Sequence, residues 1–427
     1  MRRKSLFLVT VLIAAIGICS LTAYAQDVTL RFSFPGSSEA ERQWAADFKA
    51  YIEDKYPDIT IEYLHIPGGD LIKRITVMMA AGDVPDLILA QDITDYVAMG
   101  ALEPLDEYVA KDDDISMDVF SEGALKFSQV DGVTYTLPTI AVGYGLLVNT
   151  NLLTEAGFSL EDLQTWDDLL QAAKAMTKDG NYGWAFCGSV PRFLFRDFYV
   201  SAASNGLMYD ELSKPENKQK FIELMNFYID LAPYITPAAK GLEWGDLHRY
   251  IVDNRVGFIA TGTYYSGYLW GFTPASLEYL RPIQFPKGPS VDKPLSLVGN
   301  AGFGIFADSS HKEIAWQVVK EALNQRFAAQ LAGSINVTAL NNIPEDVMAA
   351  EVNKYFAEHL DAQMEILDAW SGILGEGGVP QPGLLGQTEI ERAYQESFFK
   401  MLEGQISAEE MYERFISEVK VIEEDYR

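Results

Sequence analysis

Cysteine and histidine are scarce in this chain of 427 residues, which contains two cysteines and four histidines. Cys19 falls in an N-terminal segment that we expect to be removed, so Cys187 is left as a single thiol and no intramolecular disulfide is expected. Cys187 stands in an apolar run and is predicted to be a buried structural thiol. The histidines are far apart and form no HExxH pair, so they predict no metal site of closely spaced ligands.

Catalytic motifs are also missing. The sequence has no GxSxG elbow, no GxGxxG fingerprint and no phosphate-binding loop. Ser309 to Lys312 matches S-x-x-K, but a serine before a helix is usually a cap, and the acidic run at 112–114 lacks the glycine and glutamate of an EF-hand. We therefore predict no catalytic residues, no metal and no cofactor. One alternative stays open, because 61 acidic residues always offer carboxylate pairs of the glycosidase kind.

Long hydrophobic runs are absent after the N-terminus. The basic start at 2–4, the apolar run Leu6 to Ile18 and the sequence Ala23-Tyr24-Ala25 predict a signal peptide over residues 1–25. A lipid anchor on Cys19 is the alternative, but Ile18 stands where a small residue is expected before a lipidated cysteine. No later stretch approaches the ~18 apolar residues of a spanning helix. We expect an exported, soluble, periplasmic protein without membrane insertion.

Positive charge is in the minority. Lys and Arg number 33 against 61 Asp and Glu, which gives a formal net charge of −28. Such a surface repels nucleic acid and anionic lipid, so neither is expected as a partner. A well-solvated surface explains the acidity, and we infer no cationic ligand from it.

The pattern of apolar residues predicts an α/β fold. A chain of this length favours two domains. The first part alternates strands at 28–34, 59–63 and 87–89 with helices, the first of which begins at a capping box of Ser38 and Glu41. Further on we predict a strand at 133–137 that Pro138 interrupts, and a helix capped by Thr165. Strands are then expected at 182–187, 256–260 and 295–306, helices at 216–232 and 311–332, and a helical tail from 389 with Ser407 as a cap.

Several segments together resemble the family 1 extracellular solute-binding proteins, the group that contains the maltose-binding protein. They are FKAYIEDKYPDITIEYLHIPGGDLIKRITVMMAAGDVPDLILA, GVTYTLPTIAVGYGLLVNTNLLTEAGF, TWDDLLQAAKAMTKDGNYGWAF, RVGFIATGTYYSGYL and GNAGFGIFADSSHKEIAWQVVKEAL. They occur in the family's order across most of the chain.

This resemblance implies a type II periplasmic binding protein fold, in which two α/β lobes are joined by a hinge of several strands and the ligand lies in the cleft between them. The N-terminal lobe would comprise 26–140 and 297–338, and the C-terminal lobe 141–296 and 339–427. The crossings between lobes would fall near 138–145, 296–302 and 336–341. The implied function is capture of a sugar or oligosaccharide and its delivery to the permease subunits of an ABC importer.

A neutral sugar is held by aromatic faces against its C–H surface and by carboxylates or amides around its hydroxyl groups. In an open α/β sheet such groups stand in loops at the carboxyl ends of strands. Asp92 matches an acidic sugar ligand of the family, and Tyr264 falls where the family has an aromatic platform, usually Trp. The predicted ligand-binding residues are Ser37, Ser38, Gln91, Asp92, Tyr144, Arg196, Trp244, Tyr264, Tyr265, Gly302 and Trp370.

Each of these residues has an alternative role. Asp92 could cap a helix that begins at Ile93, and Tyr264 and Tyr265 could belong to the core. Trp244 and Trp370 stand in glycine-rich stretches that resemble loops, and could equally pack. Phe195, Arg196 and Asp197 could line the wall of the second lobe, but the aromatic residues around them indicate the core as readily. For the whole protein, the alternatives are binding of another small molecule, such as an amino acid or polyamine, and a secreted carbohydrate-active hydrolase. We expect a monomer.

Overall fold

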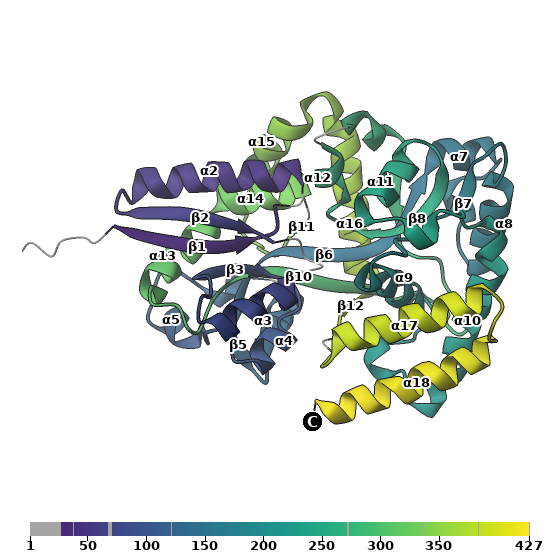
Figure 1. Cartoon of the computed structure of the whole chain (residues 1–427). Helices are drawn as coiled ribbons and strands as arrows, with labels where there is room; N and C mark the ends of the chain where they lie inside the picture. The colour runs from purple at the N-terminus through teal and green to yellow at the C-terminus, as the bar shows by residue number, and fades with distance from the viewer. Residues whose placement is uncertain are drawn as a thin grey trace, which may run out of the picture.

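The computed structural model describes residues 27–36, 38–66, 71–120, 122–270, 273–335, 337–382 and 384–426. The chain forms two lobes side by side along one mixed sheet (Figure 1). The strand order of this sheet is β2-β1-β3-β10-β6-β8-β7, with β9, β11 and β12 paired to its two long central strands. The expected two-lobed α/β architecture is confirmed. The expected signal peptide and Ser37 lie outside the described residues.

The N-terminal lobe is built on β1, β2 and β3, which are parallel to one another where they pair. Helices cover both faces of this part of the sheet, and α2 and α14 pack together on one of them (Figure 1). The elements of this region are β1 Val28–Phe34, α2 Glu39–Lys55, β2 Ile59–His65, α3 Leu71–Ala81, β3 Leu87–Ala90, α4 Thr94–Ala98, α5 Asp106–Ala110, α6 Glu122–Phe127, β4 Gln129–Val130, β5 Val133–Thr134, α13 Lys312–Ala322, α14 Gln325–Ile335 and β11 Val337–Thr338. Helix α15, Glu345–Phe356, follows β11 and packs against α14.

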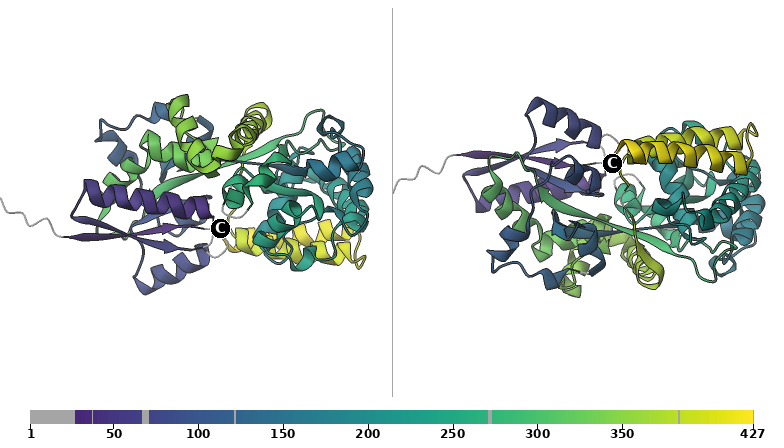
Figure 2. Two further views of the ribbon diagram at one scale, coloured as in Figure 1. Left: turned by 90° about the horizontal axis from the view of Figure 1, so that it is seen from above. Right: turned by 90° about the horizontal axis from the view of Figure 1, so that it is seen from below.

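The C-terminal lobe is largely helical around β7, β8 and β9. Both views in Figure 2 show it beside the N-terminal lobe, with the end of the last helix near the middle of the molecule. Its elements are α7 Thr150–Glu155, α8 Trp166–Met176, β7 Tyr182–Trp184, α9 Pro191–Ala203, α10 Lys218–Leu231, α11 Trp244–Val252, β8 Val256–Gly262, α12 Tyr265–Trp270, β9 Leu280–Ile283, α16 Leu360–Gly377, β12 Gly378–Pro380, α17 Gln387–Leu402 and α18 Ala408–Asp425.

Two strands run from one lobe into the other. They are β6, Thr136–Asn149, and β10, Ser296–Ile305, which pair antiparallel. Nearly every residue of β6 is buried, which explains its continuous apolar sequence. At one end β10 pairs with β3, and at the other end β6 pairs with β8. A single sheet therefore extends through both lobes.

The predicted interruption at Pro138 is wrong, because β6 continues through this residue. Pro138 lies opposite Gly302 and Ile140 lies opposite Ala301, so the register shifts between the two pairs. An irregularity of this kind accommodates a proline, which has no N–H to donate to the neighbouring strand. The chain thereby crosses to the second lobe in one uninterrupted strand.

Two other predictions need correction. The single helix expected at 311–332 is two helices, α13 and α14, with the break at Leu323 and Asn324. The Asn324 side chain accepts a hydrogen bond from the Arg326 backbone N–H at 3.0 Å, so it starts the second helix. The strand expected at 182–187 ends at Trp184, and only the Ala185 N–H continues the pairing, to the Phe258 carbonyl.

Candidate functional site

A cavity of about 110 Å³ lies between the lobes. Its lining combines residues after β3, the segment from α6 to β4, the two crossing strands and the start of α9. The lining residues are Gln91, Asp92, Ile93, Thr94, Lys126, Phe127, Gln129, Val130, Tyr144, Arg192, Gly299, Asn300, Gln381 and Pro382. The structure thus brings three of the residues predicted from sequence, Gln91, Asp92 and Tyr144, to one cavity.

Asp92 stands where the sheet of the N-terminal lobe meets this cavity. It follows β3 by two residues, and its Oδ1 accepts a hydrogen bond from the Thr94 backbone N–H at 3.2 Å. The carboxylate therefore organises the turn into α4, close to the capping alternative, and it also lines the cavity. The two roles are compatible because a carboxylate has several acceptor positions.

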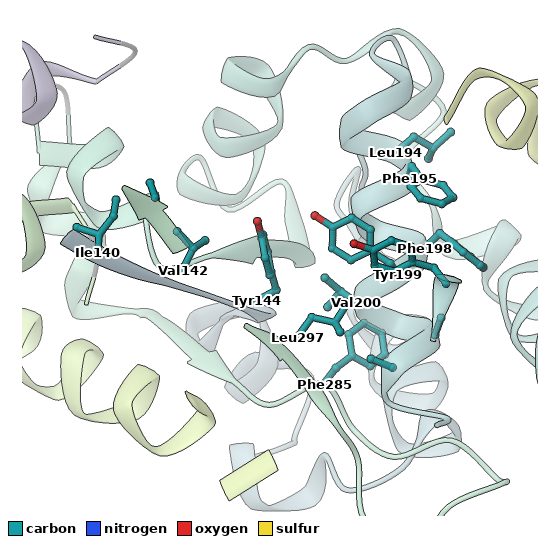
Figure 3. Close-up of a cluster of buried hydrophobic side chains, with 14 of the residues drawn as sticks. Ile140, Val142, Tyr144, Leu194, Phe195, Phe198, Tyr199, Val200, Phe285 and Leu297 are labelled. Carbon is teal, nitrogen blue, oxygen red and sulfur yellow. The ribbon is translucent and has the colours of Figure 1, made fainter. Parts of the chain in front are cut away.

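Tyr144 joins the crossing strand β6 to helix α9. Its ring centroid lies 5.6 Å from that of Tyr199, at an interplanar angle of 82°, which is an edge-to-face contact. Figure 3 shows the two labelled rings next to each other between β6 and α9. Burial raises the pKa of Tyr144, so its hydroxyl stays protonated and can donate a hydrogen bond. An aromatic face and a hydroxyl donor are thus fixed at the cavity wall.

Arg192 faces the cavity from the start of α9. Burial lowers its pKa, but nearby groups that include the Glu391 and Asp92 carboxylates more than offset that effect. The side chain therefore stays charged, with one of these carboxylates on each lobe. Asn300, in crossing strand β10, donates hydrogen bonds to the Ala124 carbonyl at 2.7 Å and to the Ser128 hydroxyl at 3.0 Å. These bonds hold α6 against the strand.

Six polar lining residues were missed by the sequence analysis: Thr94, Lys126, Gln129, Arg192, Asn300 and Gln381. For Arg192 a signal exists, because it precedes Arg196 by four residues and shares its helix face. Asn300 lies beside Gly299 in a segment already predicted to cross between the lobes. The other four lie in or beside short elements that carry no clear sequence pattern: Thr94 in α4, Lys126 in α6, Gln129 in β4 and Gln381 directly after β12.

Two of the predicted residues, Trp244 and Tyr264, belong to an aromatic cluster in the C-terminal lobe. The other members of this cluster are Phe193, His248 and Tyr268. The Trp244 ring centroid lies 5.9 Å from that of Tyr264 and 4.4 Å from those of His248 and Tyr268. Tyr264 directly precedes α12, which packs against α2 of the other lobe. Burial lowers the pKa of His248 to about 4, so the imidazole is neutral at pH 7.

Arg196 lies against this cluster. Its guanidinium carbon is 5.0 Å from the Phe193 ring centroid and 5.5 Å from that of Tyr264. The side chain is buried, which allows these cation–π contacts to be strong. Trp244 is the first residue of α11, so the prediction that it lies in a loop is wrong. The glycine beside it, Gly245, is accommodated within the helix, where the Tyr268 side chain fills the space next to it.

Tyr265 and Trp370 are fully buried, with ring centroids 6.4 Å apart. Trp370 stands within helix α16 and not in a loop as predicted. Ile366 and Ile373 flank it at helical spacing and are buried too, and this apolar stripe outweighs the glycines near the helix end. For both aromatic residues the structure favours the packing alternative.

Two other predicted residues have structural roles. The Ser38 hydroxyl accepts a hydrogen bond from the Glu41 backbone N–H at 3.1 Å, and the Glu41 carboxylate accepts one from the Ser38 backbone N–H at 3.0 Å, which completes the predicted capping box. At Gly302 a Cβ atom would lie 2.8 Å from the Leu137 carbonyl oxygen, so glycine is needed there for strand contact. Gly299, three residues earlier, is the glycine that lines the cavity.

Over the described ranges, the side chains of His, Cys, Asp and Glu form no group of three that could hold a metal ion. Among the helices in these same ranges, none combines the length and the apolar character needed to cross a bilayer.

The family model for bacterial extracellular solute-binding proteins matches residues 36–328. A putative binding protein of Brucella abortus is 24% identical over 315 residues, which cover 72% of this chain and 75% of the relative. The maltotriose-binding protein of Pyrococcus abyssi is 23% identical over 374 residues, which cover 82% of this chain and 77% of the relative.

Solved structures agree on the fold. A solute-binding protein from Thermotoga lettingae bound with α-D-tagatose has a TM-score of 0.75 and 19% identity, covering 93% of this chain and 99% of its own. Maltose-bound MalE3 of T. maritima has a TM-score of 0.73 and 18% identity, with 92% and 99% covered. With two lobes around a cavity and a family model that matches more than half of its length, the chain belongs to the bacterial extracellular solute-binding proteins.

Proposed function

We propose that this protein captures a sugar or oligosaccharide in the periplasm and delivers it to an ABC importer in the membrane. The observation that carries the proposal is the interlobe cavity, where amide and carboxylate side chains from both lobes surround the Tyr144 ring. These are the groups that bind the hydroxyl edge and the C–H face of a sugar ring. Relatives named for maltotriose, and solved structures bound to maltose or tagatose, support it.

We assign ligand contact to Gln91, Asp92 and Tyr144 at the cavity, and to Arg196, Trp244 and Tyr264 beside it. The partly exposed rings of Trp244 and Tyr264 supply stacking faces. Ser38 and Gly302 would shape the walls of the cleft, because Ser38 caps helix α2 and Gly302 allows close contact between strands β10 and β6.

Capture would proceed by hinge closure. The cavity of about 110 Å³ is smaller than the ~300 Å³ at which small-molecule sites usually begin, so entry of a sugar requires the lobes to separate. The rotation would occur in the crossings at 138–145, 296–302 and 336–341, between lobes bounded at 140/141, 296/297 and 338/339. The ligand stabilises the closed form because it touches both walls only there.

The same proposal includes a free, monomeric periplasmic protein without catalytic activity. The exported family and the apolar and basic pattern of residues 1–25 support the location. The carbohydrate-binding relatives support a binding role over a hydrolase.

A thermal-shift screen of the purified mature protein against mono- and oligosaccharides tests the function. A ligand at 100 times its dissociation constant adds about 2.7 kcal/mol to the free energy of unfolding. Amino acids and polyamines form the comparison arm. Stabilisation by an amino acid or polyamine, with none by any carbohydrate, would contradict sugar capture.

A further inference from the structure

Arg196 is a buried cation whose hydrogen-bonding capacity is not used within the described part of the chain. The residue is 5% exposed, and its Nε and Nη2 atoms have no hydrogen-bond partner there. These two nitrogens form one edge of the guanidinium, and their N–H groups point in parallel in the fork that matches a carboxylate. A buried guanidinium without such an acceptor is costly to the folded state, which indicates that a partner completes it.

The position of Arg196 on its helix directs it toward the cleft. Arg192, four residues earlier, lines the interlobe cavity, and Tyr199, three residues later, contacts Tyr144, which lines the same cavity. Residues at these spacings share one helix face. The rings of Phe193 and Tyr264 lie beside the guanidinium at 5.0 and 5.5 Å, and both residues are only partly buried. Arg196 is therefore held by aromatic rings on the cleft side of α9.

The neighbouring Asp197 does not neutralise this charge. It is 2% exposed, and neither of its carboxyl oxygens has a hydrogen-bond partner among the described residues. Burial raises the pKa of Asp197 to about 8 despite the opposing effect of Arg196, so the carboxyl is mostly protonated at pH 7. Among the described residues, neither Asp197 oxygen forms a hydrogen bond to Arg196, and Nε and Nη2 of Arg196 have no partner.

Charged groups of both signs surround the cavity. Lys126 and Arg192 line it together with the single carboxylate of Asp92, and Glu391 lies close to Arg192. Lys126 belongs to the N-terminal lobe, whereas Arg192 and Arg196 share α9 of the C-terminal lobe, in a chain whose formal net charge is −28. Because the carboxyl groups of Asp92, Asp95 and Glu391 lie near Arg192, the group that favours a negative ligand is Arg196, whose Nε and Nη2 have no partner among the described residues.

We propose that the ligand is an acidic sugar, a uronic acid or a uronate-containing oligosaccharide, whose carboxylate binds side-on to Nε and Nη2 of Arg196. The inference rests on the proposed function and names the substrate class of that site. A planar carboxylate presents two oxygens that match the two parallel N–H groups, whereas a neutral sugar leaves the charge unpaired. The Phe193 and Tyr264 rings would keep the fork in place before the ligand arrives, and this lowers the entropic cost of binding.

The first test compares matched ligands on the wild-type protein by calorimetry and thermal shift. The probes are D-galacturonate and D-glucuronate with their short oligomers, the methyl esters of the same sugars, the neutral sugars galactose and glucose, and galactose 6-sulfate. We expect a uronate to bind about 10- to 100-fold more tightly than its methyl ester, which keeps the ring and removes the charge.

The second test uses variants of one residue. Arg196→Gln should abolish the preference for the uronate over its ester, and Arg196→Lys, which keeps the charge without the fork, should retain only part of it. Arg414→Gln, an exposed arginine of α18, removes the same charge and should leave the preference unchanged. Without ligand, the Arg196→Gln protein should unfold at the same temperature as the wild type or at a higher one. A lower unfolding temperature would be expected if Arg196 had a purely structural role.

The inference is overturned if neutral sugars bind the wild type as tightly as uronates do, or if the Arg196→Gln protein still prefers the uronate to its methyl ester. Either result would leave the proposed capture of a sugar intact. If galactose 6-sulfate stabilises the protein and no uronate does, the assignment of a carboxylate as the group bound by Arg196 is overturned. If no carbohydrate of either kind binds, the proposed function itself fails, and the inference fails with it.

Discussion

Asp197 offers a direct test of how burial controls charge in the C-terminal lobe. The residue is 2% exposed, and neither carboxyl oxygen has a hydrogen-bond partner among the described residues. Burial raises its pKa to about 8, against an unperturbed value of 3.8. We predict that Asp197→Asn, which keeps the shape and cannot ionise, makes the protein more stable at neutral pH.

The magnitude follows from proton binding. Between pH 3.8 and about 8 the native state holds a proton that the unfolded state has released, so the free energy of unfolding falls as the pH rises through this window. Each pH unit costs about 1.4 kcal/mol, or about 4 kcal/mol by pH 7. The asparagine variant avoids this loss. We expect it to exceed the wild type by roughly 2–4 kcal/mol at pH 7 and to match it near pH 4.

Urea denaturation of both proteins at pH 4, 5, 6, 7 and 8 measures the difference. Asp230→Asn, at an exposed position of α10, is the matched control and should follow the wild-type curve. The reasoning is refuted if Asp197→Asn is less stable than the wild type at pH 8, or if the two curves run parallel from pH 4 to pH 8. Either outcome would mean that Asp197 is ionised in the folded protein.

Four further predictions concern the cleft, the crossing and the N-terminus. Tyr264→Ala should weaken sugar binding by about 1–3 kcal/mol in calorimetry with an unchanged circular dichroism spectrum, and unaltered affinity would assign the ring to the core. Trp370→Ala should lower the free energy of unfolding by about 3–5 kcal/mol, since the ring is fully buried, and a loss below about 1 kcal/mol would contradict this. Saturating ligand should reduce the radius of gyration in small-angle scattering, and unchanged interlobe distances between spin labels would argue against closure. Mass spectrometry of the exported protein should find Gln26 at the N-terminus, and a diacylated Cys19 there would disprove a free periplasmic form.

The elements predicted well from sequence are those governed by nearby residues. The capping boxes predicted at Ser38 with Glu41 and at Ser407 with Glu410 both form, and Thr165 caps its helix as predicted, with Asp168 completing a box there. The first three strands alternate or run apolar in the way that their burial requires. Such signals act within one turn or one strand, so no tertiary information is needed to detect them.

The predictions that failed depend on distant partners. Pro138 stays in its strand because β10 shifts register opposite to it, and β10 is far away in the sequence. Asp92 and Tyr144 could be predicted because one follows a strand and the other lies in a crossing segment. Lys126, in the short helix α6, and Gln381, directly after β12, could not, because only the folded chain brings these distant segments to the same cavity.

The order in which the chain builds its sheet has a consequence for export. Ala90 pairs with Gly302, and Gly304 pairs with Thr136, so the N-terminal lobe cannot complete its sheet until β10 has been synthesised. Contacts between segments so far apart in sequence form slowly. A growing chain that lacks β10 keeps β3 and β6 without their common neighbour, and we expect it to remain unfolded for most of its synthesis. If residues 1–25 act as the proposed signal peptide, this topology favours passage through a translocation channel, because the protein reaches its final shape only after that segment has emerged.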